Sequence, residues 1–491
     1  MNALIDQEIL QLHASIAALD RKRKRLAGRL PSYKLTLNPV RRLPNEILAY
    51  IFGLCLDEPA PHEAVFVSLR PSGPRWVVSQ VCKQWRALAI SLPQLWTIVG
   101  VNFRPPGSEM DSGRVVESPA VERLLSVCLQ RARDKPLCIC WGQYWSTDKL
   151  LSVLLSRSYQ WKDARFTVGM DGVRFLSSHI GMFPNLISLC LSFEEDNWSD
   201  ADPEDKIYMA FQDAPSLRYL SLHGCPDAWR ILPKLLPWKQ TIELNISGVN
   251  DGFISDMEED CWDFLPLMEN LRVWSLEMLD YAGPMPVIRL ANLHTLILRP
   301  RDALEDGSPL LRSLVLPALK ALRFEDQISP TEADEILSLI ARSECRLEEL
   351  VLFGGGIVEI DMEEYLSSEG LKWLTTLHLS GESLNDQGRR ASVTDDIIDA
   401  LRVLPPDTDM GITVPRLRKL IITGVKQWPD ACLVDVLASR RYVDHFPAGS
   451  VARLEEISLM GGEEDGFCIQ DPVAKAQLQG LIEGGLITNF S

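Results

Sequence analysis

At 491 residues the chain is too long for one compact core, which favours several domains or a repeat array. Hydrophobic residues make up 46% and charged residues 24%, as in ordinary globular proteins, and no apolar run is long enough for a membrane span. The formal charge is -17, yet residues 1–42 hold nine Lys and Arg against three acids, so residues 43–491 are strongly acidic. An acidic body repels polyanions, which argues against nucleic acid as the main partner.

Residues 4–30 predict an amphipathic helix (domain 1–30) with strict heptad spacing. Its apolar positions alternate at steps of four and three, and Arg23 fills the one polar place among Ile5, Ile9, Leu12, Ile16, Leu19, Leu26 and Leu30. Such a stripe must be buried against another helix, and packing within the same chain is the first expectation, with self-association or a partner as the alternative. The basic run 21–25 fits a solvated face or a nuclear-import signal. Pro31 and the residues up to Pro39 are expected to end the helix.

A second helical region is expected over residues 31–96. Pro44 suits a first helical turn, Glu46 suits the positive end of the helix dipole, and helical spacing links Ile47, Leu48, Ile51, Phe52 and Cys55. Residues 57–75 are proline-rich and predict a loop. One further helix is expected from Trp76, with an apolar face of Val77, Val78, Val81, Cys82, Trp85, Leu88 and Ala89. Pro93 ends it before Leu95-Trp96 closes the unit.

Residues 97–118 are expected to form a linker, after which predicted helices and strands alternate. Segments 121–131 and 148–156 predict helices, and segments 137–141 and 164–168 predict strands, so 119–180 resembles two degenerate repeat units. Cys138 and Cys140 would share one face of the first strand. A metal pair there is conceivable, but no further ligand completes a zinc spacing nearby.

An L-x-x-L-x-L pattern recurs over residues 181–462, ahead of an expected C-terminal cap at 463–491. Clear copies are Leu186/Leu189/Leu191, Leu217/Leu220/Leu222, Leu293/Leu296/Leu298, Leu347/Leu350/Leu352 and Leu374/Leu377/Leu379. Looser copies are Leu271/Trp274/Leu276, Leu319/Leu322/Phe324, Leu417/Leu420/Ile422 and Leu454/Ile457/Leu459, and the weakest is Thr241/Leu244/Ile246. Most spacings between the first positions of successive copies are close to the period of leucine-rich repeats.

The leucines alternate, so they point to one side of a strand, and no single unit can bury that side alone. The expected fold is therefore α/β: an N-terminal helical region, then a leucine-rich-repeat solenoid over 119–491, in which a curved parallel sheet carries helices on its convex side.

Catalytic patterns are not found in the sequence. It contains no G-x-x-x-x-G-K-[ST], H-E-x-x-H or G-x-S-x-G motif, so we expect neither an enzyme nor a cofactor site. The eleven cysteines are an odd, scattered set, which fits a reducing compartment and hence the cytoplasm, the nucleus or both.

Two segments of the helical region carry a recognisable motif. Residues 43–52 read LPNEILAYIF, residues 81–89 read VCKQWRALA, and Leu95-Trp96 follows. Together they resemble the F-box, whose pattern is L-P-x-E-I-L-x-x-I-F, V-C-x-x-W-R-x-L-A and L-W. A heptad helix before the box and divergent leucine repeats after it also look like the F-box proteins of mushroom-forming fungi. The proline-rich 57–75 segment is longer than the brief stretch that usually joins the two halves of the box in this family.

The resemblance implies that the box binds the Skp adaptor, and through it cullin, in a ubiquitin ligase that marks proteins for proteasomal degradation. Carried over residue by residue, the packed and adaptor-facing apolar surface would consist of Leu43, Pro44, Ile47, Leu48, Ile51, Val81, Cys82 and Trp85.

The solenoid would then bind an unknown protein substrate through outward side chains of its inner sheet. Period-two alternation selects Tyr219, Ser221, His223, Thr295, Ile297, Arg299, Glu349, Val351, Phe353, Thr376, His378, Ser380, Lys419, Ile421 and Thr423. The alternative is a binding scaffold with no role in ubiquitination, in which the box only caps the solenoid.

Overall fold

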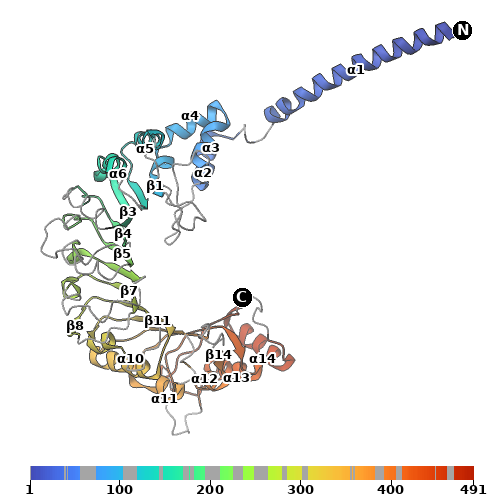
Figure 1. Ribbon diagram of the computed structural model, residues 1–491. Coiled ribbons are helices and arrows are strands. Elements are labelled where there is room, and N and C mark those ends of the chain that lie inside the picture. The colour runs from blue at the N-terminus through green and yellow to red at the C-terminus, as the bar shows by residue number, and fades with distance from the viewer. Residues whose placement is uncertain are drawn as a thin grey trace.

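A helical N-terminal part is followed by a long curved solenoid in the computed structural model (Figure 1). The described residues are 2–37, 40, 43–55, 73–102, 119–142, 148–169, 176, 182–193, 211–224, 236–247, 264–278, 285–300, 308–353, 357, 360–381, 392–404, 412–447, 449–461 and 469–490. The expected loop at 57–75 lies almost entirely outside them.

The first helix, α1, runs from Asn2 to Leu37 and projects away from the rest of the chain (Figure 1). The prediction that Pro31 ends it is wrong, because the helix continues past this residue. An interior proline removes one hydrogen bond and crowds the preceding turn, which a helix can survive as a local defect. The described side chains, residues 10–28, are all exposed, so for them the expectation of packing within the chain is also wrong.

Three short helices follow, and the expected single helix after Trp76 is in fact two. They are α2 (Asn45–Leu54), α3 (Pro74–Val81) and α4 (Lys83–Ser91), with the 3-10 turn η2 (Pro93–Trp96) behind them. Cys82 is extended and breaks the helix, and its Sγ accepts the backbone N–H of Trp85 at 3.4 Å as the cap of α4. Cysteine is not among the usual cap residues, so the break has no clear sequence signal.

Strand β1 (Ile98–Asn102) begins directly after these helices, inside the expected 97–118 linker. It pairs in parallel with β2, so the solenoid sheet starts two residues after Trp96. The Trp96 ring meets the Trp76 ring edge-on at 5.1 Å, and the Arg75 guanidinium donates to the Ile98 carbonyl at 2.8 Å. The helical unit and the first strand therefore share one core.

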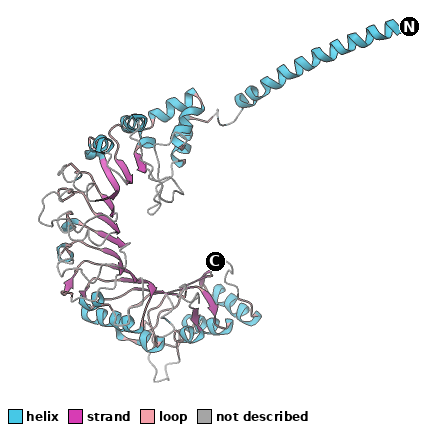
Figure 2. Cartoon of the chain, in the orientation of Figure 1, coloured by secondary structure: helices cyan, strands magenta, loops and turns pink. Residues whose placement is uncertain are grey.

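One sheet of fourteen strands, paired in parallel throughout, lines the inner side of the curve (Figure 2). After β1 it contains β2 (Leu137–Gly142), β3 (Trp161–Val168), β4 (Ser188–Phe193), β5 (Tyr219–Gly224), β6 (Glu243–Ser247), β7 (Val273–Met278), β9 (Thr295–Pro300), β11 (Ala321–Gln327), β12 (Glu349–Phe353), β13 (Thr376–Ser380), β15 (Lys419–Thr423), β17 (Glu456–Met460) and β18 (Ile487–Phe490).

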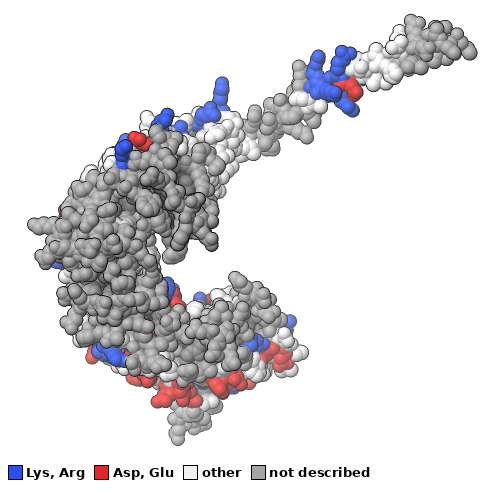
Figure 3. Space-filling model, viewed as in Figure 1, with Lys and Arg blue, Asp and Glu red and all other residues white. Residues whose placement is uncertain are grey.

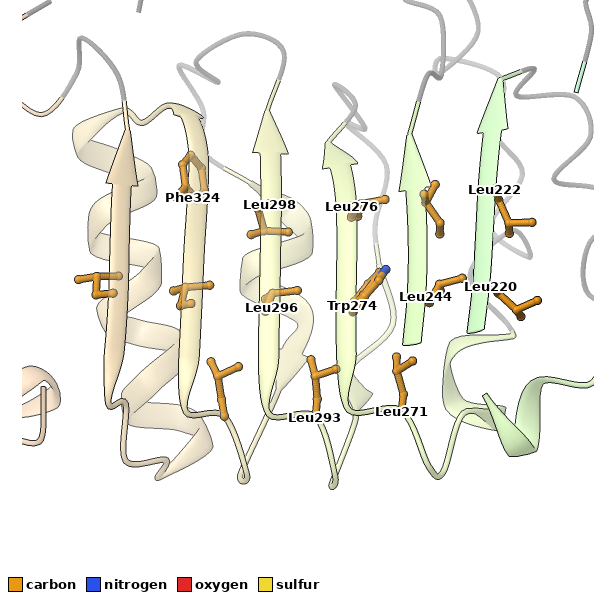
Figure 4. Packing of buried hydrophobic residues seen from close by; sticks show 14 of the residues in the cluster. Leu220, Leu222, Leu244, Leu271, Trp274, Leu276, Leu293, Leu296, Leu298 and Phe324 are labelled. Atoms are coloured by element: carbon orange, nitrogen blue, oxygen red, sulfur yellow. The ribbon is translucent and has the colours of Figure 1, made fainter. Parts of the chain in front are cut away.

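The predicted leucine pattern is confirmed as the core of this sheet. Each of the ten copies places its second and third apolar residue in a strand, and neighbouring copies pair in register, as Leu220 does with Leu244 and Leu222 with Ile246. All residues of the pattern are at most 3% exposed. Figure 4 shows them pointing to one side of the sheet, into the space between the strands and the outer layer. Stacking completes a core that no repeat has alone.

Helices and turns cover the outer side of the sheet (Figure 2). The helices are α5 (Pro119–Ala132), α6 (Asp148–Leu155), α9 (Pro309–Ser313), α10 (Pro330–Ser343), α11 (Met362–Ser367), α12 (Asp395–Asp399), α13 (Asp430–Arg441) and α14 (Pro472–Glu483). The 3-10 turns are η3 (Ser158–Gln160), η7 (Trp238–Gln240), η10 (Leu265–Leu267) and η12 (Glu369–Leu371). Two small parallel pairs join β8 (Ile288–Arg289) to β10 (Leu314–Val315) and β14 (Ser392–Thr394) to β16 (Val425–Gln427).

A ladder of polar side chains links successive repeats at the start of the strands. The residue just before the first motif position donates to a backbone carbonyl of the preceding repeat. The pairs are Asn185 to Tyr159, Ser216 to Pro184, Gln240 to Ala214, Asn270 to Lys239 and Asn292 to Glu269. In later repeats, Arg346 and Arg416 instead stack on the Trp373 ring at 4.5 and 3.9 Å.

Candidate partner-docking surfaces

Helix α2 exposes a row of large apolar side chains. Ile47, Tyr50, Ile51 and Leu54 are 36–69% exposed and occupy positions i, i+3, i+4 and i+7, which is a single helical face. Its buried side is formed by Leu48 and Phe52. We call these four exposed residues the α2 row. A helix that exposes four large apolar side chains on one face has the form that a partner groove recognises.

Helices α3 and α4 add further exposed apolar residues to the same unit. Val77 and Val81 on α3 are 48% and 56% exposed, and Ile90 on α4 is 38% exposed. Trp85 is half-buried, and its ring packs against the Phe52 ring at 4.9 Å, so it supports α2 from behind. The unit is thus held together by Phe52 and Trp85 while its outer apolar side chains stay in solvent.

The eight residues predicted to face an adaptor divide into three groups. Pro44, Ile47, Ile51 and Val81 are exposed, and Leu43, Cys82 and Trp85 are half-buried. Leu48 is 0% exposed, so it belongs to the core and cannot be a contact residue. Ile47 and Leu48 are adjacent in the sequence, and in this helix Leu48 faces the core with Phe52 while Ile47 faces solvent.

Sequence reasoning missed four exposed positions, which are Tyr50, Leu54, Val77 and Ile90. The signal for the first two was present, since they continue the i, i+3, i+4, i+7 series that begins at Ile47. For Val77 the signal was hidden, because the sequence places it on one apolar face with Val78, whereas the structure exposes Val77 and buries Val78 within the same helix α3.

The second surface is the inner face of the sheet, where the residues between the motif leucines lie. Tyr219 is 43% exposed. Side chains of intermediate exposure are Ser221, His223, Thr295, Ile297, Arg299, Glu349, Phe353, Thr376, His378, Lys419, Ile421 and Thr423. Val351 and Ser380 are buried, at 5% and 0%, so the expectation that they are available on the surface is not met.

Ion pairs join neighbouring strands across this inner face. Arg299 reaches Glu325 at 2.8 Å, Arg323 reaches Glu349 at 2.9 Å, and Lys419 reaches Glu456 at 2.9 Å. Arg299 also donates to the Ser275 hydroxyl at 2.6 Å. Partly exposed pairs of this kind contribute about 0–1 kcal/mol each to stability. Their main effect is to neutralise these three cations on the inner face.

His378 lies beside these pairs in a partly apolar setting. Its Nε2 is 2.7 Å from the Thr423 hydroxyl, and its ring meets Phe353 edge-on at 5.1 Å. Burial, followed by the charge of Arg323, lowers the pKa of His378 below its ordinary 6.5. The imidazole is therefore neutral at pH 7 and can exchange a hydrogen bond with Thr423.

Within the described residues no group of three or more metal-binding side chains is present. The surroundings of Cys138 do not favour the metal pair that was considered for Cys138 and Cys140. The Cys138 thiol donates a hydrogen bond to the Asp163 carboxylate at 3.3 Å. Burial, together with that carboxylate, raises the pKa of Cys138 to about 12, so the thiol stays protonated and is a poor metal ligand. None of the described helices is long and apolar enough to span a membrane.

Comparison with known proteins identifies the helical unit. Residues 40–100 match the family model described as F-box-like. The chain carries an F-box-like domain. No curated protein matches the sequence. A structural-genomics target from Bacteroides fragilis is 17% identical over 48% of this chain and 65% of its own length, with a TM-score of 0.29, which is too low for any argument about fold or function.

F-box domains generally bind Skp adaptors, and the matched range contains every exposed apolar residue of α2, α3 and α4. It ends at Gly100, within β1, so it also includes the junction with the sheet. The chain is thus an F-box-like domain followed directly by a solenoid with a parallel sheet.

Proposed function

We propose that this chain is a non-catalytic substrate adaptor of a Skp–cullin–F-box ubiquitin ligase. The α2 row is the observation that carries the proposal. It places four large apolar side chains in solvent within the domain that matches the F-box. Removing one such side chain from water stabilises a complex by about 1.5–3 kcal/mol at full burial. The row therefore supplies several contacts of the kind that dominate tight interfaces.

The inner face of the solenoid would hold the protein substrate. It is concave, lined by strands and formed by partly exposed polar and aromatic side chains, such as Tyr219, Thr295 and Phe353 (Figure 2). The ligase chemistry would belong to other subunits, and this chain would supply proximity between the substrate and the activated ubiquitin. It needs no catalytic residues or cofactor of its own for that role.

The shared core at Trp76, Trp96 and Arg75 supports this division of labour. It fixes the first strand of the solenoid against the F-box helices, so a substrate on the sheet would be held in a set direction from the Skp adaptor. The protonated, half-buried Cys138 thiol suits a reducing compartment, and we propose action in the cytoplasm, the nucleus or both.

The competing function is a binding scaffold without a ligase role. Affinity purification of the full chain from cells distinguishes the two, using Ile47→Asp/Leu54→Asp to disrupt the α2 row. Val473→Asp is the matched control, since Val473 is 66% exposed on α14, far along the chain from the box. The adaptor proposal expects Skp and cullin with the wild type and the control but not with the double variant. Absence of both from the wild type would favour the scaffold.

A further inference from the structure

Helix α1 carries a narrow apolar seam that nothing in the described chain covers. Leu12, Ile16, Leu19 and Leu26 are 55–65% exposed and follow the heptad spacing of the sequence. The helix is 36 residues long, and an isolated helix gains most of its stability only when such a seam is buried. The seam lies outside the F-box-like domain, so its role goes beyond the adaptor function.

The width of the seam indicates its occupant. A helix that lies on a membrane or a globular core needs a broad apolar face, whereas a strict two-in-seven stripe is the contact line of a coiled coil. In the heptad register Ile16 takes the a position, and Leu12, Leu19 and Leu26 take d positions. A seam of this kind is buried when its side chains pack as knobs into the holes of a second helix that carries the same kind of seam. A second copy of α1 meets this requirement without any other partner.

Charge decides how the two copies are oriented. Residues 21–25 are five consecutive basic residues, all exposed, and they form the blue cluster on α1 in Figure 3. In a parallel pair the basic run of one helix would lie beside the basic run of the other. Arg23, at an a position, would then face the Arg23 of the second copy. Like charges at such short range oppose association. In an antiparallel pair centred between Ile16 and Leu19, Arg23 instead lies opposite Leu12.

The antiparallel arrangement separates the two basic runs along the axis. Positions 12 and 23 are eleven residues apart, which is about 16 Å at 1.5 Å per residue. This exceeds the screening length of about 8–10 Å at physiological salt. Arg23 also keeps its own partner, Asp20, at 3.3 Å on the same helix.

We propose that the chain forms a homodimer through an antiparallel coiled coil of α1. The two F-box-like domains then lie at opposite ends of the helix pair, about 50 Å or more apart given the helix length. Each dimer would present two solenoids and two α2 rows that do not obstruct each other.

The oligomeric state of the full chain tests the dimer. Light scattering coupled to gel filtration should give twice the chain mass for the wild type and the monomer mass for Leu19→Asp. Leu10→Asp is the matched control, because Leu10 lies on the same helix, 69% exposed and outside the seam, and it should remain dimeric. A monomeric wild type, or a dimer that survives Leu19→Asp, would overturn the proposal.

Cysteine cross-linking tests the orientation. Two full-length variants of different tag size, Leu12→Cys and Arg23→Cys, are mixed and oxidised, with the wild type as the control for native cysteines. The antiparallel register expects a disulfide between the two different variants and little cross-linking of either variant with itself. Efficient cross-linking of Leu12→Cys with itself would show a parallel pair. Seam-dependent pelleting of a monomeric chain with phosphatidylserine vesicles would show a membrane helix, and either result contradicts the proposal.

Discussion

The F-box-like domain and the solenoid treat apolar side chains in opposite ways. In the solenoid, every residue of the leucine pattern is at most 3% exposed, because each repeat is completed by its neighbours. In the F-box-like domain, Ile47, Tyr50 and Leu54 are 47–69% exposed, although the same short helix buries Leu48 and Phe52 almost completely. Apolar residues are thus a structural core in one region and a docking surface in the other, and exposure separates the two roles where sequence does not.

Charge and polarity repeat this contrast. The inner sheet face pairs its cations with acids on neighbouring strands, and a ladder of side-chain amides satisfies carbonyls between repeats. The solenoid therefore satisfies these polar groups internally. The F-box-like domain instead exposes the apolar α2 row, which no described residue covers, and we expect an external partner to bury it.

The largest expected effect is a difference in stability between two aspartate substitutions on α2, one in the core and one in the α2 row. Leu48→Asp buries a charge in a fully enclosed site and should cost about 4 kcal/mol, enough to unfold α2 locally. Leu54→Asp should change stability by less than about 0.5 kcal/mol, because Leu54 is 69% exposed. Amide hydrogen exchange of α2–α4 measures both. Equal losses of protection would show that the row is part of the core.

Arg440 tests how far the solenoid satisfies its own polar groups. Its guanidinium is fully buried and donates to the carbonyls of Leu401, Thr413 and Val414. Burial lowers the pKa of Arg440 to about 9, so it remains charged at neutral pH. Arg440→Ala should cost about 3–5 kcal/mol, since it removes the side-chain donor of the buried Leu401 and Thr413 carbonyls.

Hydrogen exchange in the repeats around β15 and β17 measures this loss. The control is Arg453→Ala, whose side chain pairs with Asp444 on the surface and should have little effect. An Arg440→Ala variant as well protected as this control would show that other contacts hold the backbone at Leu401, Thr413 and Val414.

Each hydrogen bond in the ladder of polar side chains should contribute less to stability than Arg440 does. Asn292→Ala removes the hydrogen bond from its Nδ2 to the Glu269 carbonyl, which is worth about 1 kcal/mol. The denaturant midpoint of the solenoid transition should fall accordingly, while Glu269→Ala, which keeps the accepting carbonyl, should be nearly neutral. A midpoint unchanged by Asn292→Ala would mean that the ladder is incidental to stacking.

His378 should give the smallest effect, visible only through pH. Its lowered pKa means that the folded chain resists protonation more than the unfolded chain does. Its contribution is therefore fully present above about pH 6.5 and is lost as the pH falls below that value. The melting temperature of His378→Gln should depend less on pH between neutral and mildly acidic conditions than that of the wild type. An identical pH dependence would contradict the assigned environment.

Much of the solenoid could be predicted from the sequence, because the leucines carry a period of two and a repeat length that no helix shares. Positions such as Leu296 and Leu322 lie in paired strands as expected. The first strand was missed, since Ile98–Asn102 has no leucine motif. The ladder of polar side chains was missed because its residue type varies between Asn, Ser and Gln. Only the register of the paired strands makes these positions equivalent.

The docking site was harder to predict for a physical reason. In a short helix nearly every apolar residue fits some helical face, so spacing alone could not separate Leu48 from Ile47. The decision depends on tertiary packing, here on the Phe52–Trp85 contact that sets which side of α2 turns inward. The same limit applies to Val77, which is exposed while its neighbour Val78 on the same helix is buried.

The affinity of the purified full chain for a Skp adaptor, measured by calorimetry, tests the central claim most directly. Replacing Ile47 and Leu54 by Asp should weaken binding at least about 100-fold, which corresponds to about 2.7 kcal/mol from two contact residues. Val473→Asp should bind like the wild type. Equal affinities for wild type and double variant, or a wild type that does not bind the adaptor, would contradict the assignment of the α2 row as the docking surface.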